Sequence, residues 1–280
     1  MTVPTQVGVY GGGRMGAGIA HAFLVSGAHV TVVESSTDSA DAARERIETT
    51  LSRAVDRGHL AAGIAPTLAR LTVSTDAAQL SDCGLVVEAV PERADLKREV
   101  LTSIERAAPD AWAPPTPRAC PWTPLPRRWH APKGFVGLHF VNPVPASQLV
   151  EIVVGTRTAP DLVDLSRSWV ADLGKTPIAV SDSLGFASSR LGVAIALEAM
   201  RMLEKGVASA EEIDTAMELG YKHPIGPLRT TDIVGLDVRL AIAEHLAREA
   251  GHRFAPPSIL REKVAAGHLG RKSGQGFYTW

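Results

Sequence analysis

Three glycines stand at a spacing that lets a backbone turn bind a phosphate group. Residues 11–16 read Gly-Gly-Gly-Arg-Met-Gly, which satisfies the pattern G-x-G-x-x-G. The first glycine allows a tight turn, the second leaves bare backbone beside a pyrophosphate, and the third lets a helix pack closely on the preceding strand. The competing interpretation is a glycine-rich turn without a ligand. The predicted pyrophosphate-binding residues are Gly11, Gly12, Gly13, Arg14, Met15 and Gly16.

A carboxylate follows at the end of the next predicted strand. Glu34 comes directly after Val30–Val33, where an acidic side chain accepts hydrogen bonds from the hydroxyls of an adenosine ribose. A 2′-phosphate would meet a like charge there, and Ser35 and Ser36 supply no arginine to compensate. Glu34 therefore predicts NAD rather than NADP as the cofactor. The competing interpretation is a solvated glutamate at a strand end.

A histidine and a glutamate farther along the chain can do acid–base chemistry. His139 stands at a strand end in Leu-His-Phe-Val-Asn-Pro, and Glu151 lies twelve positions on. Histidine titrates near neutral pH, so His139 can take a hydroxyl proton while a hydride leaves the same carbon. Glu151 can orient the ring and stabilise the imidazolium. The competing interpretation, a structural histidine near a chance glutamate, fits most of the nine histidines of the chain.

An alternation of strands and helices is predicted to position these residues. Residues 7–10 and 30–33 read as strands around a helix over 14–26 that Gly27 closes, which is a βαβ unit. Further expected elements are a helix over 40–57, a strand over 84–90, a helix through 96–104, strands over 135–140 and 149–154, a helix over 160–173 and a strand over 178–180. Beyond Gly185 three helices are expected. The first runs through 191–202, the second begins at a capping box over 209–212, and the third covers 234–248.

This pattern predicts an α/β protein in two domains. Residues 1–183 would form an NAD-binding domain with a Rossmann-like, mostly parallel sheet, and residues 184–280 an all-helical C-terminal domain.

Composition excludes several other classes of protein. The chain has 280 residues, 45% hydrophobic and 21% charged, which excludes wholesale disorder. Lys+Arg 29 against Asp+Glu 30 gives no basic field for nucleic acid, and two cysteines form no metal cluster or disulfide framework. No apolar run approaches the ~20 residues that cross a bilayer, and the N-terminus lacks the features of a secretory signal. We therefore expect a cytoplasmic protein with no metal, membrane or nucleic-acid partner.

Five blocks stand in one order along the chain: 11–20 (GGGRMGAGIA), 86–97 (VVEAVPERADLK), 137–152 (GLHFVNPVPASQLVEI), 214–237 (DTAMELGYKHPIGPLRTTDIVGLD) and 267–278 (GHLGRKSGQGFY). Together they resemble the 3-hydroxyacyl-CoA dehydrogenases, especially the bacterial 3-hydroxybutyryl-CoA type, over nearly the whole length. The resemblance implies an enzyme that uses NAD to oxidise a 3-hydroxyacyl-CoA to the 3-oxoacyl-CoA, or the reverse. It assigns His139 as general base and Glu151 as its partner.

The same resemblance implies further roles. Glu92 and Lys97 would hold the nicotinamide ribose, and Asn142 and Lys272 would lie near the same end of the cofactor. From the sequence alone, Glu92 and Lys97 could equally be a solvated pair at a helix start. The C-terminal helices would form a homodimer interface and one wall of the acyl pocket, although their apolar face also fits an ordinary intramolecular core.

The chain departs from the family pattern at two places. Ser189 stands where the family has an asparagine near the reacting centre; a hydroxyl reaches less far than an amide, so the substrate pocket is altered or a water intervenes. The family's Thr-Asn-Thr-Ser is also missing from residues 111–126, where Arg118 falls near the place of the serine. Eight of the 19 prolines lie between Pro109 and Pro132, a density that excludes a regular core strand.

The genetic code offers an explanation for this second departure. Read from the third base of the Ala111 codon, the shifted triplets permit Leu-Gly-Thr-Thr-Asn-Thr-Ser-Cys-Leu-Pro-Val-Asp, in which the glycine and the aspartate are forced. Farther on, the codons of Arg127–Lys133 permit Ala-Ala-Leu-Ala-Arg-Thr-Glu, a helical run that leads into Phe135. We therefore interpret residues 111–132 as a family motif translated out of frame, through a sequencing error or compensating indels. The competing interpretation is a genuine proline-rich loop.

Three functions remain open at this point. The first is a dehydrogenase of 3-hydroxyacyl-CoA. The second keeps the chemistry but takes a hydroxyacyl group on a carrier protein or a free hydroxy acid, an option that Ser189 favours. The third is a catalytically impaired NAD-binding homologue, which applies if residues 111–132 are present as written.

Overall fold

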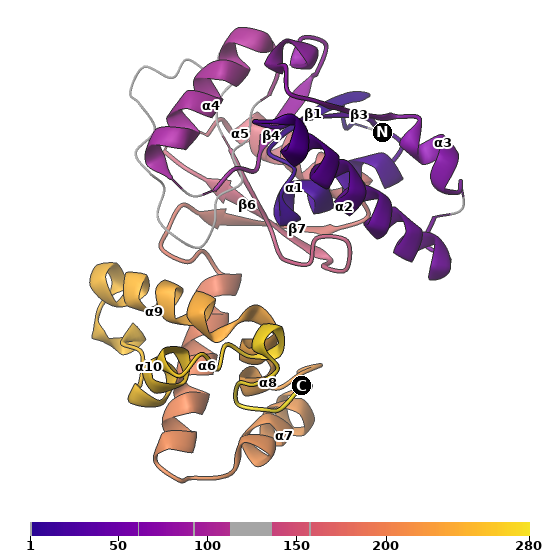
Figure 1. Cartoon of the computed structure of the whole chain (residues 1–280). Coiled ribbons are helices and arrows are strands. Elements are labelled where there is room, and N and C mark those ends of the chain that lie inside the picture. The colour runs from indigo at the N-terminus through magenta and orange to yellow at the C-terminus, as the bar shows by residue number, and fades with distance from the viewer. Residues whose placement is uncertain (1, 61, 92, 113–135, 157) are drawn as a thin grey trace. The chain divides into compact units, whose positions relative to one another are not determined.

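The computed structural model describes residues 2–60, 62–91, 93–112, 136–156 and 158–280. Within these ranges the chain divides into two compact units, one ending at Asp182 and the other running from Ser183 to Trp280 (Figure 1). The boundary expected from the sequence was 183/184. We describe each unit by itself.

The first part of unit 1 alternates strands and helices, as the βαβ pattern predicts. Its elements are β1 (Gln6–Tyr10), α1 (Arg14–Val25), β2 (His29–Val33), α2 (Thr37–Asp56), α3 (Ile64–Leu68), β3 (Leu71–Ser74), the short 3-10 helix η1 (Ala77–Leu80), β4 (Leu85–Glu88) and α4 (Ala94–Ala107). Gly27 takes a positive φ of 99° just beyond α1. It therefore ends that helix as expected.

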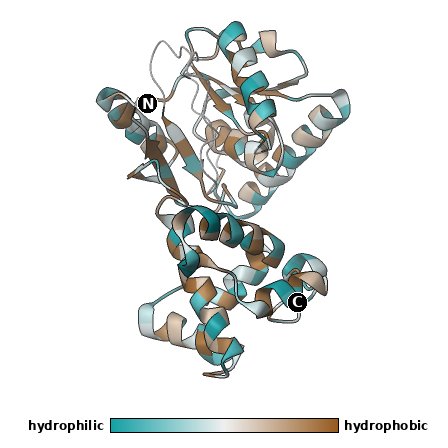
Figure 2. Cartoon of the chain, turned by 90° about the vertical axis from the view of Figure 1, so that its left-hand side faces the viewer, coloured by the Kyte–Doolittle hydropathy of each residue, from teal (hydrophilic) through white to brown (hydrophobic). Residues whose placement is uncertain are grey.

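Strands β1 to β4 form one parallel sheet in the order β3-β2-β1-β4. Both faces of this sheet are covered, so its strands are apolar on both sides. Leu85 and Val87 pack into a core with α1 and α2, whereas Val86 packs with α4 and η1. The hydrophobic colouring along the strands in Figure 2 reflects this burial. The carboxyl ends of all four strands consequently meet at one edge.

The second part of unit 1 forms a three-stranded sheet in the order β5-β6-β7. Its elements are β5 (Gly137–Phe140), β6 (Leu149–Val154), α5 (Pro160–Asp172) and β7 (Thr176–Ser181). β6 pairs with β7 in parallel and with β5 in antiparallel orientation. Among the described strands, β5–β6 is the one antiparallel pair, so the expectation of a mostly parallel arrangement is confirmed.

Between these two sheets in sequence lies the proline-rich segment. Trp112 N–H donates to the Gly84 carbonyl (3.0 Å), and the Trp112 carbonyl accepts from Val86 N–H (2.7 Å), so Trp112 pairs beside β4. Its ring meets that of Trp169 edge-on at 6.1 Å between centroids. Residues 113–135, and with them most of the stretch that we interpret as out of frame, lie outside the described residues.

Unit 2 is helical, as predicted. Its elements are α6 (Ser188–Glu204), α7 (Ala210–Tyr221), α8 (Pro227–Val234), α9 (Leu236–Ala250), η2 (His252–Phe254), α10 (Ser258–Ala265) and η3 (Arg271–Ser273). The predicted capping box is present at the start of α7, where Ser209 and Glu212 exchange backbone-to-side-chain hydrogen bonds. No helix within the described ranges is both long enough and apolar enough to cross a membrane.

Several predicted boundaries are wrong. The helix expected over 40–57 is α2 at Thr37–Asp56, and the strand expected over 178–180 is β7 at Thr176–Ser181. The expected helix over 234–248 begins two residues late, because Val234 ends α8 and Gly235 takes a φ of 106° before α9 starts. The expected strand over 84–90 is confined to Leu85–Glu88. It ends there because Glu88 turns its side chain back and accepts the Val90 N–H (2.7 Å), which closes a local turn ahead of Pro91.

Candidate active site

The glycine turn joins β1 to α1 and leaves the helix N-terminus open. A Cβ at Gly16 would lie 1.7 Å from the Gly11 carbonyl oxygen, so only glycine lets α1 approach the turn. A Cβ at Gly13, the residue that precedes α1, would meet nothing within 4 Å, and no side chain caps the helix there. The unpaired N–H groups of the first turn therefore face open space, an arrangement that fits a pyrophosphate.

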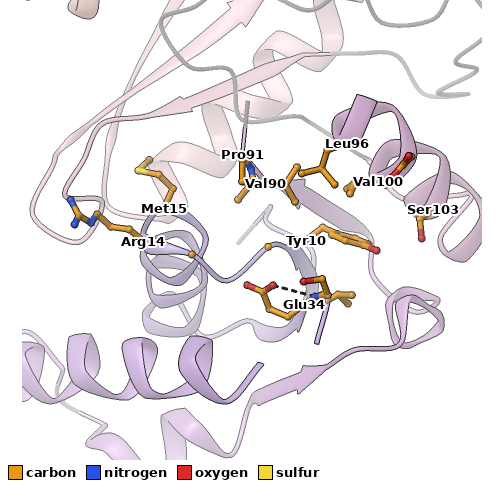
Figure 3. Close-up of a pocket in the computed structure, with 15 residues that line it drawn as sticks. Tyr10, Arg14, Met15, Glu34, Val90, Pro91, Leu96, Val100 and Ser103 are labelled. Atoms are coloured by element: carbon orange, nitrogen blue, oxygen red, sulfur yellow. Dashed lines mark hydrogen bonds between the residues drawn. The ribbon is translucent and has the colours of Figure 1, made fainter. Parts of the chain in front are cut away.

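A pocket of about 610 Å³ lies beside this turn, at the carboxyl edge of the parallel sheet (Figure 3). Its lining residues come from the ends of β1, β2 and β4, the start of α1 and one face of α4: Tyr10, Gly11, Gly13, Arg14, Met15, Val33, Glu34, Ser35, Ala89, Val90, Pro91, Leu96, Glu99, Val100 and Ser103. Sequence reasoning did not single out the α4 residues for this role. Their helical spacing at 96, 99, 100 and 103 marks one face, but the same spacing also fits an ordinary core.

Glu34 borders this pocket at the end of β2. Its Oε1 accepts the Gly12 N–H at 2.6 Å and its Oε2 accepts the Ser35 N–H at 3.2 Å. These two bonds hold the carboxylate against the glycine turn and leave lone pairs for a ribose hydroxyl. Arg46 of α2, which sequence reasoning missed, donates to the Gly12 carbonyl at 3.4 Å on the same turn.

His139 and Glu151 face each other across β5 and β6. They are register partners of the antiparallel pair, and His139 Nδ1 lies 2.6 Å from Glu151 Oε2. Glu151 is fully buried, and the side chain of His139 is 12% exposed. A carboxylate is an acceptor, so the proton of the neutral ring sits on Nδ1, and Nε2 is the ring nitrogen that carries the basic lone pair. The structure thus brings together the two predicted catalytic residues.

Lys97 is not a solvated surface charge, and that competing interpretation is wrong for it. Its side chain is 7% exposed, and Nζ lies 3.2 Å from Oε2 of the fully buried Glu88 at the end of β4. Sequence reasoning missed Glu88, although an acidic residue at the end of an apolar strand is a usable signal. Glu92, the other predicted ribose contact, lies outside the described residues.

The remaining predicted residues are placed as follows. Asn142 stands in the loop that joins β5 to β6, where it is exposed. Ser189 lies in the first turn of α6 and is half-buried. Lys272 lies in η3, where its Nζ donates to both carboxylate oxygens of Asp237 at 2.6 Å. Ser189 and Lys272 belong to unit 2, whereas His139 belongs to unit 1.

The described residues contain no cluster of three His, Cys, Asp or Glu side chains that could hold a metal ion. Cys83 is buried and forms no disulfide, and burial raises the pKa of its thiol to about 11. It is therefore protonated at neutral pH and unreactive. Cys120 lies outside the described residues.

A parallel sheet whose first βα turn is an open glycine loop, with an acidic residue at the end of the second strand, is typical of a dinucleotide-binding protein. Comparison with known families agrees with this class. Residues 6–183 match the NAD binding domain of 3-hydroxyacyl-CoA dehydrogenase, and residues 185–280 match its C-terminal domain. The chain therefore belongs to the 3-hydroxyacyl-CoA dehydrogenase family, and it is an NAD-dependent oxidoreductase.

Individual relatives cover the whole chain. A 3-hydroxybutyryl-CoA dehydrogenase of Mycobacterium tuberculosis is 39% identical over 280 residues, which are 98% of each protein. The crystal structure of (S)-3-hydroxybutyryl-CoA dehydrogenase from Ralstonia eutropha is 37% identical with a TM-score of 0.90 and covers 99% of both chains. A diketoreductase described as acting on dicarbonyl compounds is 30% identical with a TM-score of 0.87 over 100% of both chains.

Proposed function

We propose that this protein interconverts a 3-hydroxyacyl-CoA and the corresponding 3-oxoacyl-CoA, with His139 as the general base. The observation that carries the proposal is the 2.6 Å contact between His139 Nδ1 and the buried Glu151. The names of the M. tuberculosis and R. eutropha relatives support the substrate class, since both are 3-hydroxybutyryl-CoA dehydrogenases.

The cofactor would be held by the residues at the carboxyl edge of the parallel sheet. Gly11 to Gly16 would bind the pyrophosphate, and Glu34 would accept the adenosine ribose hydroxyls, because the open N-terminus of α1 and the pocket beside it fit these groups. Lys97, Glu92, Asn142 and Lys272 would contact the nicotinamide end. NAD, when bound, supplies the acceptor for a hydride.

The acid–base step follows from the hydrogen bond between His139 and Glu151. Glu151 holds the Nδ1–H and so directs the Nε2 lone pair toward the hydroxyl whose proton is removed. The proton moves to Nε2, and the resulting imidazolium is stabilised by the buried carboxylate at 2.6 Å. In the reverse direction Nε2–H returns the proton to the oxygen. Ser189 would contact the substrate.

Replacement of His139 by Gln tests the proposed function. With acetoacetyl-CoA and NADH as substrates, we expect kcat to fall about 10²–10⁴-fold, because a glutamine amide cannot take or give the proton. The decay of NADH absorbance measures the rate. His29→Gln is the matched control, since His29 is exposed in the same unit. A His139→Gln variant with unchanged kcat would rule out this mechanism.

A second candidate keeps the chemistry and changes the substrate. The diketoreductase shows that a chain of this fold, 30% identical, acts on dicarbonyl compounds, and Ser189 replaces the family's asparagine. Comparison of kcat/KM for acetoacetyl-CoA, the same acyl group on a carrier protein and a free 3-oxo acid separates these options. NADH binding without turnover of any of them supports the impaired homologue instead.

Two broader proposals accompany this function. Exposed apolar side chains of unit 2, among them Leu191, Leu219, Tyr221 and Val238, favour a homodimer formed through the C-terminal helices. Light scattering on the purified protein measures its state of association. The free, buried thiol of Cys83 is compatible with the reducing cytoplasm, where we place the protein.

A further inference from the structure

Lys175 binds the loop that separates the two candidate catalytic residues in sequence. The loop spans residues 141–148 between β5, which carries His139, and β6, which carries Glu151. Lys175 stands just before β7, and its Nζ donates to the Val144 carbonyl at 2.7 Å and to the Ser147 carbonyl at 2.6 Å. These are charge-assisted hydrogen bonds in a half-buried setting, which makes them stronger than neutral ones.

The loop is otherwise held by its own backbone and by β7. The Pro143 carbonyl accepts the N–H groups of Ala146 and Ser147 at 3.0 and 2.9 Å, which closes a turn. The Gln148 carbonyl accepts the Thr176 N–H at 2.6 Å. Lys175 therefore joins the two ends of the turn, at Val144 and Ser147, to the start of β7.

The loop also packs directly on α1. A Cβ at Gly18 would lie 2.9 Å from the Cβ of Val144 and 3.4 Å from the Cδ of Pro145, so the loop rests against helix backbone. Gly18 lies two residues beyond Gly16 of the dinucleotide turn. Contact with α1 thus fixes the loop relative to the open N-terminus of that helix.

His21, one helical turn after Gly18, is a neutral neighbour of the Lys175 ammonium. The Thr50 hydroxyl donates to the Ile47 carbonyl (2.9 Å), so its oxygen accepts from His21 Nδ1 at 3.1 Å. That hydrogen bond needs only a neutral imidazole with its proton on Nδ1. Burial, and secondarily the charge of Lys175, lower the pKa of His21 to about 4, so the ring adds no like charge at neutral pH.

We propose that Lys175 is a positioning residue for the hydride-transfer site: it holds the 141–148 loop against α1, so that Asn142 and the His139–Glu151 pair keep a fixed place relative to the dinucleotide turn. The inference rests on the proposed function for its catalytic consequence. The hydrogen bonds and the packing on Gly18 support the loop-holding role by themselves.

Replacement of Lys175 by Met tests the role, because Met keeps much of the apolar stem and removes both hydrogen bonds. We expect the amides of Ala146 and Ser147 to exchange with deuterium about tenfold faster, because the turn that they close opens more often. We expect kcat to fall roughly 10–100-fold, since small misplacements of reacting groups have effects of that size. KM for NADH should change less than kcat, because the glycine turn and Glu34 are untouched and Asn142 is the one proposed cofactor contact in the loop.

Lys175→Arg and Lys205→Met complete the experiment. Arginine can donate to both carbonyls, so we expect it to restore slow amide exchange and part of kcat. Lys205 is exposed in unit 2, and its replacement should change neither measurement. All rates are compared well below the melting temperature of each variant.

Each outcome decides one of the two claims. Unchanged exchange at Ala146 and Ser147 in Lys175→Met overturns the positioning role, whether or not the wild-type protein turns over. Faster exchange with an unchanged kcat also overturns it, because the loop would then be irrelevant to the reaction. A wild-type protein that reduces no tested substrate overturns the proposed function, and the exchange measurement then judges the loop-holding role separately.

Discussion

Glu34 and Glu151 are both glutamates on or beside strands of unit 1, but their surroundings suit them to different roles. Glu151 is fully buried, and its Oε2 lies 2.6 Å from Nδ1 of His139. Glu34 is half-buried, is anchored by two backbone N–H groups and borders the pocket. A buried acceptor fixes a donor ring and stabilises its charge, whereas a half-exposed one can accept from a ligand. Exposure therefore separates the positioning carboxylate from the ligand-binding one.

His21 predicts that acid destabilises the fold. The pKa of His21 is about 4 in the folded protein, against 6.5 for an unperturbed histidine, because burial and then the charge of Lys175 disfavour the cation. Between these pH values the unfolded chain binds the proton and the folded chain does not, so stability falls as the pH is lowered through the window. At about 1.4 kcal/mol for each pH unit, the loss attributable to His21 is roughly 3 kcal/mol.

Urea unfolding at pH 7, 6 and 5 measures this dependence. His21→Gln should flatten it, because glutamine does not titrate, even if the variant is less stable at pH 7. His29→Gln, at an exposed site in the same unit, should leave the dependence as in the wild type. An equally steep fall in stability in His21→Gln and in the wild type would contradict the assignment.

At the scale of elements, two buried aspartates join α7 and α8 of unit 2 to the C-terminal residues. Asp214 accepts the backbone N–H groups of Leu228 and Arg229 and the hydroxyl of Tyr278. Asp232 accepts the N–H groups of Phe277 and Tyr278 and the indole N–H of Trp280. Six donors thus converge on two carboxylates that are 3% and 1% exposed. The C-terminal segment is part of the helical core rather than a loose end.

Loss of the Asp232 carboxylate should destabilise unit 2 more than loss of one hydrogen-bond donor to Asp214. Asp232→Ala leaves three donors without an acceptor, and we expect a loss of about 3–5 kcal/mol. Tyr278→Phe removes only one hydroxyl from Asp214, which keeps two N–H groups, and should cost about 1–2 kcal/mol. Chemical unfolding followed by tryptophan fluorescence gives both values, with the exposed Asp41→Ala as control. Equal losses for the two variants would contradict this account.

The predictable parts of the fold and site are those encoded by neighbouring residues. The glycine turn, Glu34 after a run of β-branched residues and the Ser209 capping box are local patterns, and each is present in the structure. Strand β3 was missed because four residues give no clear periodicity; it exists through its pairing with β2, where Leu71 is the partner of Val30. Gly235 was missed because the apolar spacing runs through it.

Residues whose partners are distant could not be found in this way. His21 is hydrogen-bonded to Thr50, which lies 29 positions away in the sequence. The two carbonyls that accept from Lys175 lie 28 and 31 positions away. The acceptors of Lys175 are backbone carbonyls, which carry no side-chain signature. The family resemblance assigned His139 and Glu151 as partners, and in the structure they are opposite each other in the antiparallel pair β5–β6. The resemblance also supplied Glu92, Lys97, Asn142 and Lys272, for which the sequence has no local signal.

At the scale of the whole molecule, the buried apolar residues of unit 1 and those of unit 2 form different clusters. In sequence, the proline-rich segment lies between α4 and β5. Trp112, at its start, makes its two hydrogen bonds to β4 through the backbone, so they do not depend on which side chain stands there. The pocket and the glycine turn also lie outside the segment. The sequence as written and the shifted reading therefore differ, in effect, over residues 113–132. We expect this difference to change the binding and turnover of the substrate, and to leave NAD binding the same in both proteins.

Expression of two chains tests the out-of-frame interpretation. One has the sequence as written, and the other has residues 111–133 replaced by the shifted reading with Thr-Asn-Thr-Ser. We expect both to bind NADH equally, because Gly11–Gly16 and Glu34 are the same in each. The restored chain should show at least about tenfold higher kcat/KM for acetoacetyl-CoA, since a lost donor to a substrate oxygen costs that much or more. The mass of the protein isolated from its own cells is the independent check. A mass that matches the written sequence, with peptides containing Trp112 and Trp122, would exclude a sequencing error, and equal turnover by both chains would show that the segment is a functional loop as it stands.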